Sequence, residues 1–253
     1  GGAVGDLSGF VASTYMRGIE YFQIPTTFLA MIDSSIGGKT AVNANEGKNI
    51  IGTIYQPKSV FIDPNFLNSL HKKEVNSGFG EMIKYGAIWD KNLFDQISVW
   101  LDNPSSFPFE KAIIDAVKIK SDIVSKDEKE KGLRTILNFG HTIGHAIESY
   151  YGYERIKHGE AVALGMKCAG FISNRKRLLS LNAKNKLFNT LEKLNLPNIS
   201  DINKKEIVKK IKSDKKSKKG QVKFVLLSDI GKTKIVSSVP QNLIDCLLYT
   251  SDA

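Results

Sequence analysis

The sequence has 253 residues, of which 42% are hydrophobic and 25% charged, close to the average for a soluble globular protein. No apolar run reaches the length of a transmembrane helix, so we expect no membrane partner. A net charge of +10 is compatible with nucleic-acid binding. However, much of the lysine lies in Asp201–Gly220, which has no aromatic residue for base stacking. We interpret that stretch as a solvated helix face and expect no nucleic-acid partner, although single lysines in it can still serve an anionic small molecule.

The chain opens with GGAVGD and no initiator methionine. A glycine-rich turn normally follows a strand, so we expect further sequence before Gly1 and infer little from the absence of a targeting signal. GGAVGD is compatible with a turn whose backbone approaches a pyrophosphate, although the pattern is weak because it is not GxGxxG. Cys168 and Cys246 make no disulfide framework and no cysteine-based metal site. Each cysteine lies in an apolar stretch of sequence, which favours buried free thiols in a reducing compartment and so predicts the cytoplasm.

The first seventy residues alternate β and α signals. A strand near Tyr21 leads to a loop at Pro25 and a helix from about Thr27, and a buried strand after Ser59 ends at Asp63. This alternation predicts a parallel α/β sheet.

From about His71 the pattern becomes mainly helical. Near the C-terminus, two apolar runs flank Asp229–Gly231 and predict a β-hairpin. The predicted fold class is α/β: an incomplete N-terminal Rossmann-like domain over residues 1–70, then a mainly α-helical domain over residues 71–253. The helices are expected at residues 72–90, 110–128, 138–151 and 158–177.

One lysine stands in an apolar stripe. Ile113, Val117, Lys120 and Val124 step by four, three and four residues along a predicted helix. A buried ammonium needs an anion, so Lys120 either meets one or snorkels at the edge of the stripe. The sequence leaves both interpretations open.

Glu81 and Lys84 share one face of a predicted helix. They form either a surface ion pair of little energetic weight or part of a functional site. Three glycines in the same segment favour close approach of another backbone or a ligand, and these are Gly78, Gly80 and Gly86.

Three of the four histidines lie within one short region, at His141, His145 and His158. Two imidazoles and one carboxylate with an open fourth position form a typical catalytic zinc shell. His141, His158 and Glu81 are able to supply it, and so is His145 in place of either histidine. Structural histidines are the alternative.

The stretch GGKTAVNANEGKN places Lys39, Lys48 and Asn49 among small residues. It is similar to a phosphate-binding loop but lacks the spacing of a P-loop. A plain solvent-exposed loop is the alternative.

In order, several segments resemble one family, the 3-dehydroquinate synthases, which are sugar-phosphate cyclases of the shikimate pathway. The matching strings are GDLSGFVASTYMRG, QIPTTFLAMIDSSIGGKTAVN, GKNIIGTIYQP, GEMIKYG, DEKEKGLRTILNFGHTIGHAIE and HGEAVALGM, which run from the first residue to about Met166. The resemblance implies NAD- and metal-dependent conversion of 3-deoxy-arabino-heptulosonate 7-phosphate to 3-dehydroquinate and phosphate, in a homodimer, with Zn²⁺ or Co²⁺ as the metal. The first part of the family's NAD-binding domain is absent from this sequence.

The resemblance also assigns roles by position. Glu81, His141 and His158 match the metal ligands, and the catalytic positions match His145, Glu130 and Lys84. Arg17 matches an arginine that reaches the phosphate from the neighbouring subunit. The other positions that match substrate contacts are Asp33, Lys39, Asn49, Lys120, Arg134 and Asn138. The positions that match the NAD site are Gly1, Gly2, Ala3, Asp6, Thr26, Thr27 and Lys48.

One further family lysine falls at Lys215 or Lys216, and the tail after Cys246 does not match the family's closing helix. The alternatives to this function are another sugar-phosphate cyclase, or a metal-dependent alcohol or glycerol dehydrogenase on the same fold. Two further alternatives are a nucleic-acid-binding module built on the basic stretch and an inert remnant without activity.

Overall fold

The computed structural model describes residues 1–44, 47–216, 223–237 and 239. The chain forms two compact units: unit 1 is Gly1–Gly78 with Pro108–Arg134, and unit 2 is Phe79–Phe107 with Thr135–Ala253. The change from one unit to the other falls inside helix α2 (Lys72–Ile88). The predicted domain boundary near residue 70 stays a prediction. Among the described residues, no helix combines the length and apolarity needed to cross a bilayer.

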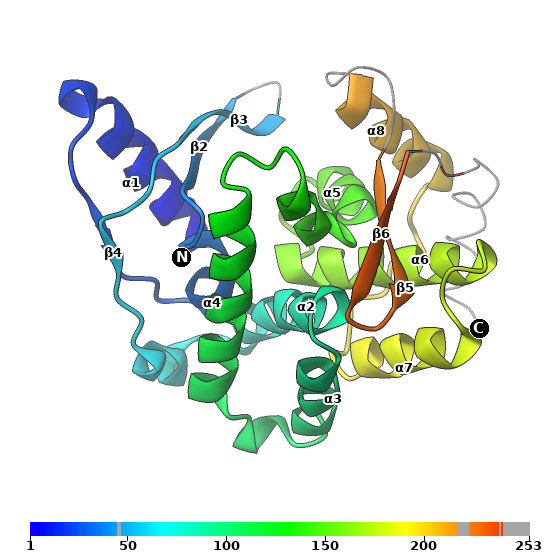
Figure 1. Ribbon diagram of the computed structural model, residues 1–253. Helices are drawn as coiled ribbons and strands as arrows, with labels where there is room; N and C mark the ends of the chain where they lie inside the picture. The colour runs from blue at the N-terminus through cyan, green and yellow to red at the C-terminus, as the bar shows by residue number, and fades with distance from the viewer. Residues whose placement is uncertain (45–46, 217–222, 238, 240–253) are drawn as a thin grey trace. The chain divides into compact units, whose positions relative to one another are not determined.

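Unit 1 combines helices with two small sheets (Figure 1). Strands β1 and β4 pair in parallel, with Phe22 opposite Ser59, whereas β2 and β3 pair antiparallel, with Lys39 opposite Ile54. Its elements are α1 (Gly2–Thr14), β1 (Phe22–Gln23), β2 (Lys39–Ala44), β3 (Gly47–Ile54), β4 (Ser59–Val60), α4 (Phe109–Lys126) and short helical turns at Tyr15–Arg17, Ala30–Ser34 and Pro64–Ser69.

The packing of unit 1 follows from its small and aromatic residues. A Cβ on Gly9 of α1 would lie 2.5 Å from Thr40 Cγ2, so glycine lets β2 approach this helix. The ring of Phe28 is completely buried and meets Phe109 of α4 edge to face, with 5.2 Å between centroids. Helix α4 therefore packs on the segment Ala30–Ser34, which carries Asp33.

Three local predictions for unit 1 are wrong. GGAVGD is not a turn but the first part of α1, and the stretch around Lys39–Asn49 is not a loop but the β2–β3 hairpin, because Thr40 and Val42 favour a strand. The strand after Ser59 is not buried: within the described residues β4 pairs only with β1, and Phe61 beside it is 57% exposed.

Unit 2 is mainly helical, with one β-hairpin. Helices α5 and α6 lie side by side, and β5 packs on α6 (Figure 1). The hairpin turns at Gly231, whose φ is +82°, and the Leu227 N–H donates to the buried Ser173 Oγ at 3.0 Å. Its elements are the end of α2, then α3 (Lys91–Trp100), α5 (His141–Tyr150), α6 (His158–Arg175), α7 (Leu181–Glu192), α8 (Lys204–Lys216), β5 (Phe224–Asp229) and β6 (Lys232–Val236), with a short turn at Pro104–Ser106 and the last part of the turn Leu133–Asn138.

The predicted helices at 72–90, 110–128, 138–151 and 158–177 are confirmed as α2, α4, α5 and α6, and the hairpin is confirmed as β5–β6. The fold class is confirmed as α/β followed by a mainly helical part. In the basic stretch, Ile207 and Ile211 of α8 are buried while Lys205 and Lys209 are exposed. The solvated helix face predicted for that stretch is therefore confirmed in the described part of α8.

Candidate functional site

Glycines bring three helices of unit 2 close together. A Cβ on Gly80 of α2 would lie 2.1 Å from the carbonyl oxygen of Gly159, at the start of α6. A Cβ on Gly165 of α6 would lie 2.0 Å from the carbonyl oxygen of Gly140, directly before α5. Only glycine permits such contacts between backbones. The expected close approach at Gly80 is confirmed as backbone against backbone.

This packing makes one side chain from each helix converge. His141 and His158 are the first residues of α5 and α6, and their Nε2 atoms lie 3.4 Å and 3.5 Å from Oε1 of Glu81 on α2. One possible ligand atom from each of the three residues lies within 4.8 Å of the other two. Two ligands of a tetrahedral zinc, each bound at about 2.0–2.1 Å, lie about 3.3 Å apart. The donor set and its spacing fit a divalent cation.

The other nitrogen of each ring faces an acceptor. Nδ1 of His141 lies 3.2 Å from the carbonyl oxygen of Phe139, and Nδ1 of His158 lies 3.0 Å from Oε2 of Glu148. Sequence reasoning missed Glu148. It lies two helical turns after His141 on α5, and that spacing was the available signal.

Burial and carboxylates move the two imidazole pKa values in opposite directions. Burial lowers the pKa of His141 to about 3, so its ring is neutral at physiological pH. Burial also lowers the pKa of His158, but hydrogen bonds with Glu148 and Glu81 outweigh it and raise the pKa to about 9. The carboxylates that raise this pKa attract positive charge to His158. Because a metal ion binds the same nitrogen as the proton, the same carboxylates favour a metal cation there.

Lys84 and His145 adjoin this group. Lys84 is 1% exposed and forms a buried ion pair with Glu81, so the surface-pair interpretation is wrong. His145 is exposed, and its ring centroid lies 5.3 Å from that of His141. His145 also forms a second possible ligand group with Glu148 and His158. Asn138 is half-buried at the end of the turn before α5.

In unit 1, the lysine of the apolar stripe meets an anion. Lys120 is 6% exposed, and its Nζ donates to Asp33 Oδ1 at 2.6 Å and to the Asp33 carbonyl oxygen at 2.5 Å. The snorkelling interpretation is wrong. Burial, together with the nearby Asp33 carboxylate, raises the pKa of Asp6 on α1 to about 6, although Lys120 and Lys48 act against it. These four side chains therefore form one electrostatic group.

A short loop after α4 carries two more predicted residues. Asp127 accepts hydrogen bonds from the N–H groups of Lys131, Gly132 and Arg134 at 2.9, 2.7 and 2.9 Å, and these lower its pKa. The loop presents Glu130, with a φ of +54°, to Lys39 of β2, and the two form an ion pair. Asp127 is the second residue that sequence reasoning missed.

Arg134, at the end of that loop, is 2% exposed. Its guanidinium donates to the carbonyl oxygen of Gly37 at 3.0 Å and to that of Glu128 at 2.5 Å. Gly37 has a φ of +100°, and a Cβ there would lie 2.4 Å from Arg134 Nη2. Glycine is therefore needed beside this arginine.

The other predicted residues of unit 1 lie on its surface or near the start of α1. Arg17 and Asn49 are exposed with φ values of +66° and +58°, and the Asn49 N–H donates to Asn43 Oδ1 at 3.2 Å. A Cβ on Gly1 would lie 3.2 Å from Thr27 Cγ2, so these two residues adjoin. Gly2, Ala3 and Asp6 lie in the first turns of α1, Thr26 precedes Thr27, and Lys48 is exposed on β3. The side chains of Lys215 and Lys216, and the tail after Cys246, lie outside the described residues.

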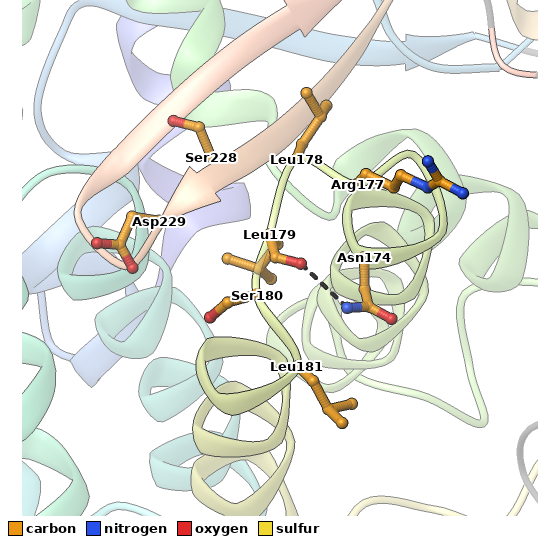
Figure 2. A pocket seen from close by; sticks show the side chains of 8 residues that line it. All are labelled: Asn174, Arg177, Leu178, Leu179, Ser180, Leu181, Ser228 and Asp229. Atoms are coloured by element: carbon orange, nitrogen blue, oxygen red, sulfur yellow. Dashed lines mark hydrogen bonds between the residues drawn. The ribbon is translucent and has the colours of Figure 1, made fainter.

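A pocket of about 590 Å³ lies elsewhere in unit 2, where the end of α6 meets the β5–β6 hairpin (Figure 2). Its polar groups serve the chain itself: Asn174 Nδ2 donates to the Leu179 carbonyl oxygen at 3.0 Å, and Ser180 Oγ accepts from the Ala183 N–H at 3.2 Å. None of the predicted site residues lines this pocket. It is lined by Asn174, Arg177, Leu178, Leu179, Ser180, Leu181, Ser228 and Asp229.

The chain is similar to proteins of known activity along almost its whole length. It is 47% identical over 251 residues to the 3-dehydroquinate synthase of Thermoanaerobacter pseudethanolicus, covering 98% of this chain and 70% of that protein. It is 47% identical over 257 residues to the 3-dehydroquinate synthase of Rippkaea orientalis, with the same coverage of 98% and 70%.

Among solved structures, the chain is similar to a 2-epi-5-epi-valiolone synthase from Streptomyces hygroscopicus with NAD⁺ and Zn²⁺ bound, with a TM-score of 0.88, 27% identity and coverage of 99% and 71%. It is also similar to a 2-deoxy-scyllo-inosose synthase in complex with carbaglucose-6-phosphate, NAD⁺ and Co²⁺. For that structure the TM-score is 0.85 and the identity 29%, and the match covers 99% of this chain and 71% of that one. A probable glycerol dehydrogenase from Sinorhizobium meliloti, at 14% identity and a TM-score of 0.60, shares the fold alone.

Family models divide the sequence between two domains. Residues 1–77 match the 3-dehydroquinate synthase N-terminal model, and residues 78–217 match the C-terminal model. Together with the identity to the bacterial enzymes, these matches identify the chain as a member of the 3-dehydroquinate synthase family.

Proposed function

We propose that this chain acts as a 3-dehydroquinate synthase. It converts 3-deoxy-arabino-heptulosonate 7-phosphate to 3-dehydroquinate and phosphate, in the biosynthesis of aromatic amino acids. Family membership supports the reaction. The observation that carries it in the structure is the convergence of Glu81, His141 and His158 beside the buried Lys84.

We assign Glu81, His141 and His158 as the residues that would hold a divalent cation, zinc or cobalt. When bound, such a cation polarises hydroxyl oxygens of the substrate and stabilises negative charge on them. The chain's own contribution is to bury Glu81 completely and to keep the His141 ring neutral.

We assign the start of α1 to NAD. The first N–H groups of a helix have no partner within the helix and favour an anion such as a pyrophosphate. When bound, NAD accepts a hydride from the substrate and returns it, so that it is not consumed. The residues proposed to contact it are Gly1, Gly2, Ala3, Asp6, Thr26, Thr27 and Lys48.

Cationic side chains are proposed to bind the substrate's anionic groups. Lys39, Lys84 and Arg17 are proposed to neutralise charge on the departing phosphate, because a cation stabilises an anionic leaving group. Lys120 and Arg134, both nearly completely buried, are held in place for the carboxylate and hydroxyl groups. The remaining proposed substrate contacts are Asp33, Asn49 and Asn138.

Two residues are proposed to move protons. His145 is exposed beside the His141 ring, and an imidazole nitrogen is able to give or take a proton. Glu130 forms an ion pair with Lys39, which holds its carboxylate in position. We also propose that the protein is a homodimer, because Arg17 matches a residue that serves the neighbouring subunit, and that it works in the cytoplasm.

The test is phosphate release from 3-deoxy-arabino-heptulosonate 7-phosphate by the purified chain with NAD and zinc. We expect phosphate without net NADH, and no phosphate from His141→Ala or His158→Ala. His71→Ala is the matched control, because His71 is the fourth histidine and lies exposed at the start of α2. Net NADH without phosphate would instead indicate a dehydrogenase, the alternative on the same fold.

A further inference from the structure

Glu148 is a buried carboxylate on α5 that the proposed reaction does not use. It is 3% exposed, and a carboxylate at such a position is unfavourable unless polar groups surround it. Its Oε2 lies 3.0 Å from Nδ1 of His158, the first residue of α6. The contact therefore joins the inner face of one helix to the N-terminus of the next.

The two ring nitrogens of His158 face two different carboxylates. Nε2 lies 3.5 Å from Glu81 Oε1, the spacing of two ligands around one zinc, whereas the 3.0 Å between Nδ1 and Glu148 is a hydrogen-bond distance. A histidine that binds a metal through one nitrogen usually donates its other N–H to a carboxylate or a carbonyl, which fixes the tautomer and the ring orientation. His141 follows the same pattern, with the Phe139 carbonyl oxygen in place of a carboxylate.

We infer that Glu148 is a positioning residue, which accepts a hydrogen bond from Nδ1–H of His158 and so presents Nε2 to the metal. This inference rests on the proposed metal site. It adds a residue to that site: the backbone orients His141, whereas a side chain that can be replaced by mutation orients His158.

The rival assignment makes Glu148 itself a ligand. His145, Glu148 and His158 also place possible ligand atoms within 4.8 Å of one another. In that arrangement Glu148 would bind the metal directly and His158 would use Nδ1. The two assignments therefore differ in the state of His158 Nδ1, which is protonated in the first and metal-bound in the second. They also differ in the carboxylate whose loss should weaken metal binding more, which is Glu81 in the first and Glu148 in the second.

The experiment measures zinc affinity of the metal-stripped chain by competition with a chelator. Glu148→Met removes the acceptor at similar volume, and we expect a 10–100-fold loss of affinity with one zinc still bound. Glu148→Gln restores an acceptor oxygen and should bind within about fivefold of wild type, whereas Glu81→Gln should lose binding altogether. Glu154→Ala, an exposed carboxylate in the loop before α6, should bind as wild type does.

Wild-type affinity in Glu148→Met would overturn the inference, and so would a loss in Glu148→Gln as large as that in Glu81→Gln. A second measurement does not depend on the folding of any variant. In the zinc-loaded wild type, ¹⁵N NMR should show His158 with a protonated Nδ1 and a metal-bound Nε2; a metal-bound Nδ1 would contradict us. If the wild type takes up no zinc, the proposed metal site fails and the inference falls with it, whereas unchanged Glu148 variants defeat the inference alone.

Discussion

The two units hold their candidate residues in different ways. In unit 2, Glu81, His141 and His158 come from three helices whose backbones touch at glycines, so the positions of these candidate ligands depend on helix packing. In unit 1, Glu130 and Arg134 come from a loop that backbone hydrogen bonds to Asp127 hold in shape. Side chains on packed helices are placed more rigidly than side chains on loops. Metal ligands need such fixed positions, because a metal site requires the right geometry.

The sharpest way to break this comparison is to separate the helices of unit 2. Gly165→Ala would bring a Cβ within 2.0 Å of the Gly140 carbonyl oxygen, and backbone cannot yield as a side chain does. We expect a loss of about 3 kcal/mol in the free energy of unfolding, together with weaker zinc binding. Urea unfolding and zinc titration measure the two effects.

Gly170→Ala in the same helix is the control. Its Cβ would meet Leu187 Cδ2 at 2.8 Å, which is a flexible side-chain end, and alanine favours a helix by about 1 kcal/mol over glycine. We expect a change within about 1 kcal/mol and unchanged zinc binding. Equal losses in the two variants would show that backbone contact does not set the ligand positions.

In unit 1 the corresponding change removes a buried charge. Lys120→Met leaves Asp33 without its lysine and close to Asp6, so we expect a loss of about 2–3 kcal/mol in the free energy of unfolding. The exposed neighbour Lys118→Met should change it by less than about 0.5 kcal/mol. Urea unfolding of both variants tests this, and a similar small effect in both would mean that the Lys120–Asp33 pair contributes nothing.

Much of this arrangement was accessible from the sequence, for identifiable reasons. The helices of unit 2 have regular apolar periodicity, so the sequence predicted α5 and α6 closely, and the glycines of α2 indicated a close backbone approach. The group of Glu81, His141 and His158 followed from residue chemistry as one of several possible ligand sets. Periodicity alone could not choose between His141 and His145, because both lie on one helical face.

Contacts between segments distant in sequence could not be predicted. Nothing in the sequence pairs Glu148 with His158, or Lys39 with Glu130, because tertiary packing decides such contacts. The β2–β3 hairpin was missed because its glycines and asparagines resemble a loop, and Asn49 in β3 has a positive φ of the kind typical of loops. The exposure of Phe61 was missed because the apolar run after Ser59 was interpreted as a buried strand.

A smaller effect is expected in the loop of unit 1. Asp127→Ala removes the acceptor for three N–H groups, and displacing Glu130 and Arg134 should lower kcat/KM about 10–100-fold. Zinc affinity should not change, since the metal group belongs to the other unit. Asp122→Ala, which breaks only an exposed pair with Lys126, serves as the control. A loss of zinc affinity in Asp127→Ala would show that the metal group also depends on this loop.

The smallest effect concerns pH. Burial raises the pKa of Asp6 from its ordinary value of 3.8 to about 6 in the folded chain, so the unfolded chain releases this proton at lower pH. The contribution of Asp6 to stability therefore falls as the pH rises from about 4 to about 6, and stays lower above that. Asp6→Asn should flatten this decline and raise Tm at pH 8 more than at pH 4. Thermal unfolding at the two pH values measures it, and an equal shift at both would contradict the raised pKa.

The central claim is that two neighbouring histidines of α5 have different roles, and zinc content tests it most directly. After dialysis against zinc and then zinc-free buffer, wild type and His145→Ala should retain one zinc per chain, measured by atomic emission, while His141→Ala retains none. His145→Ala should nevertheless lose turnover. Retention of zinc by His141→Ala together with its loss from His145→Ala would contradict the account.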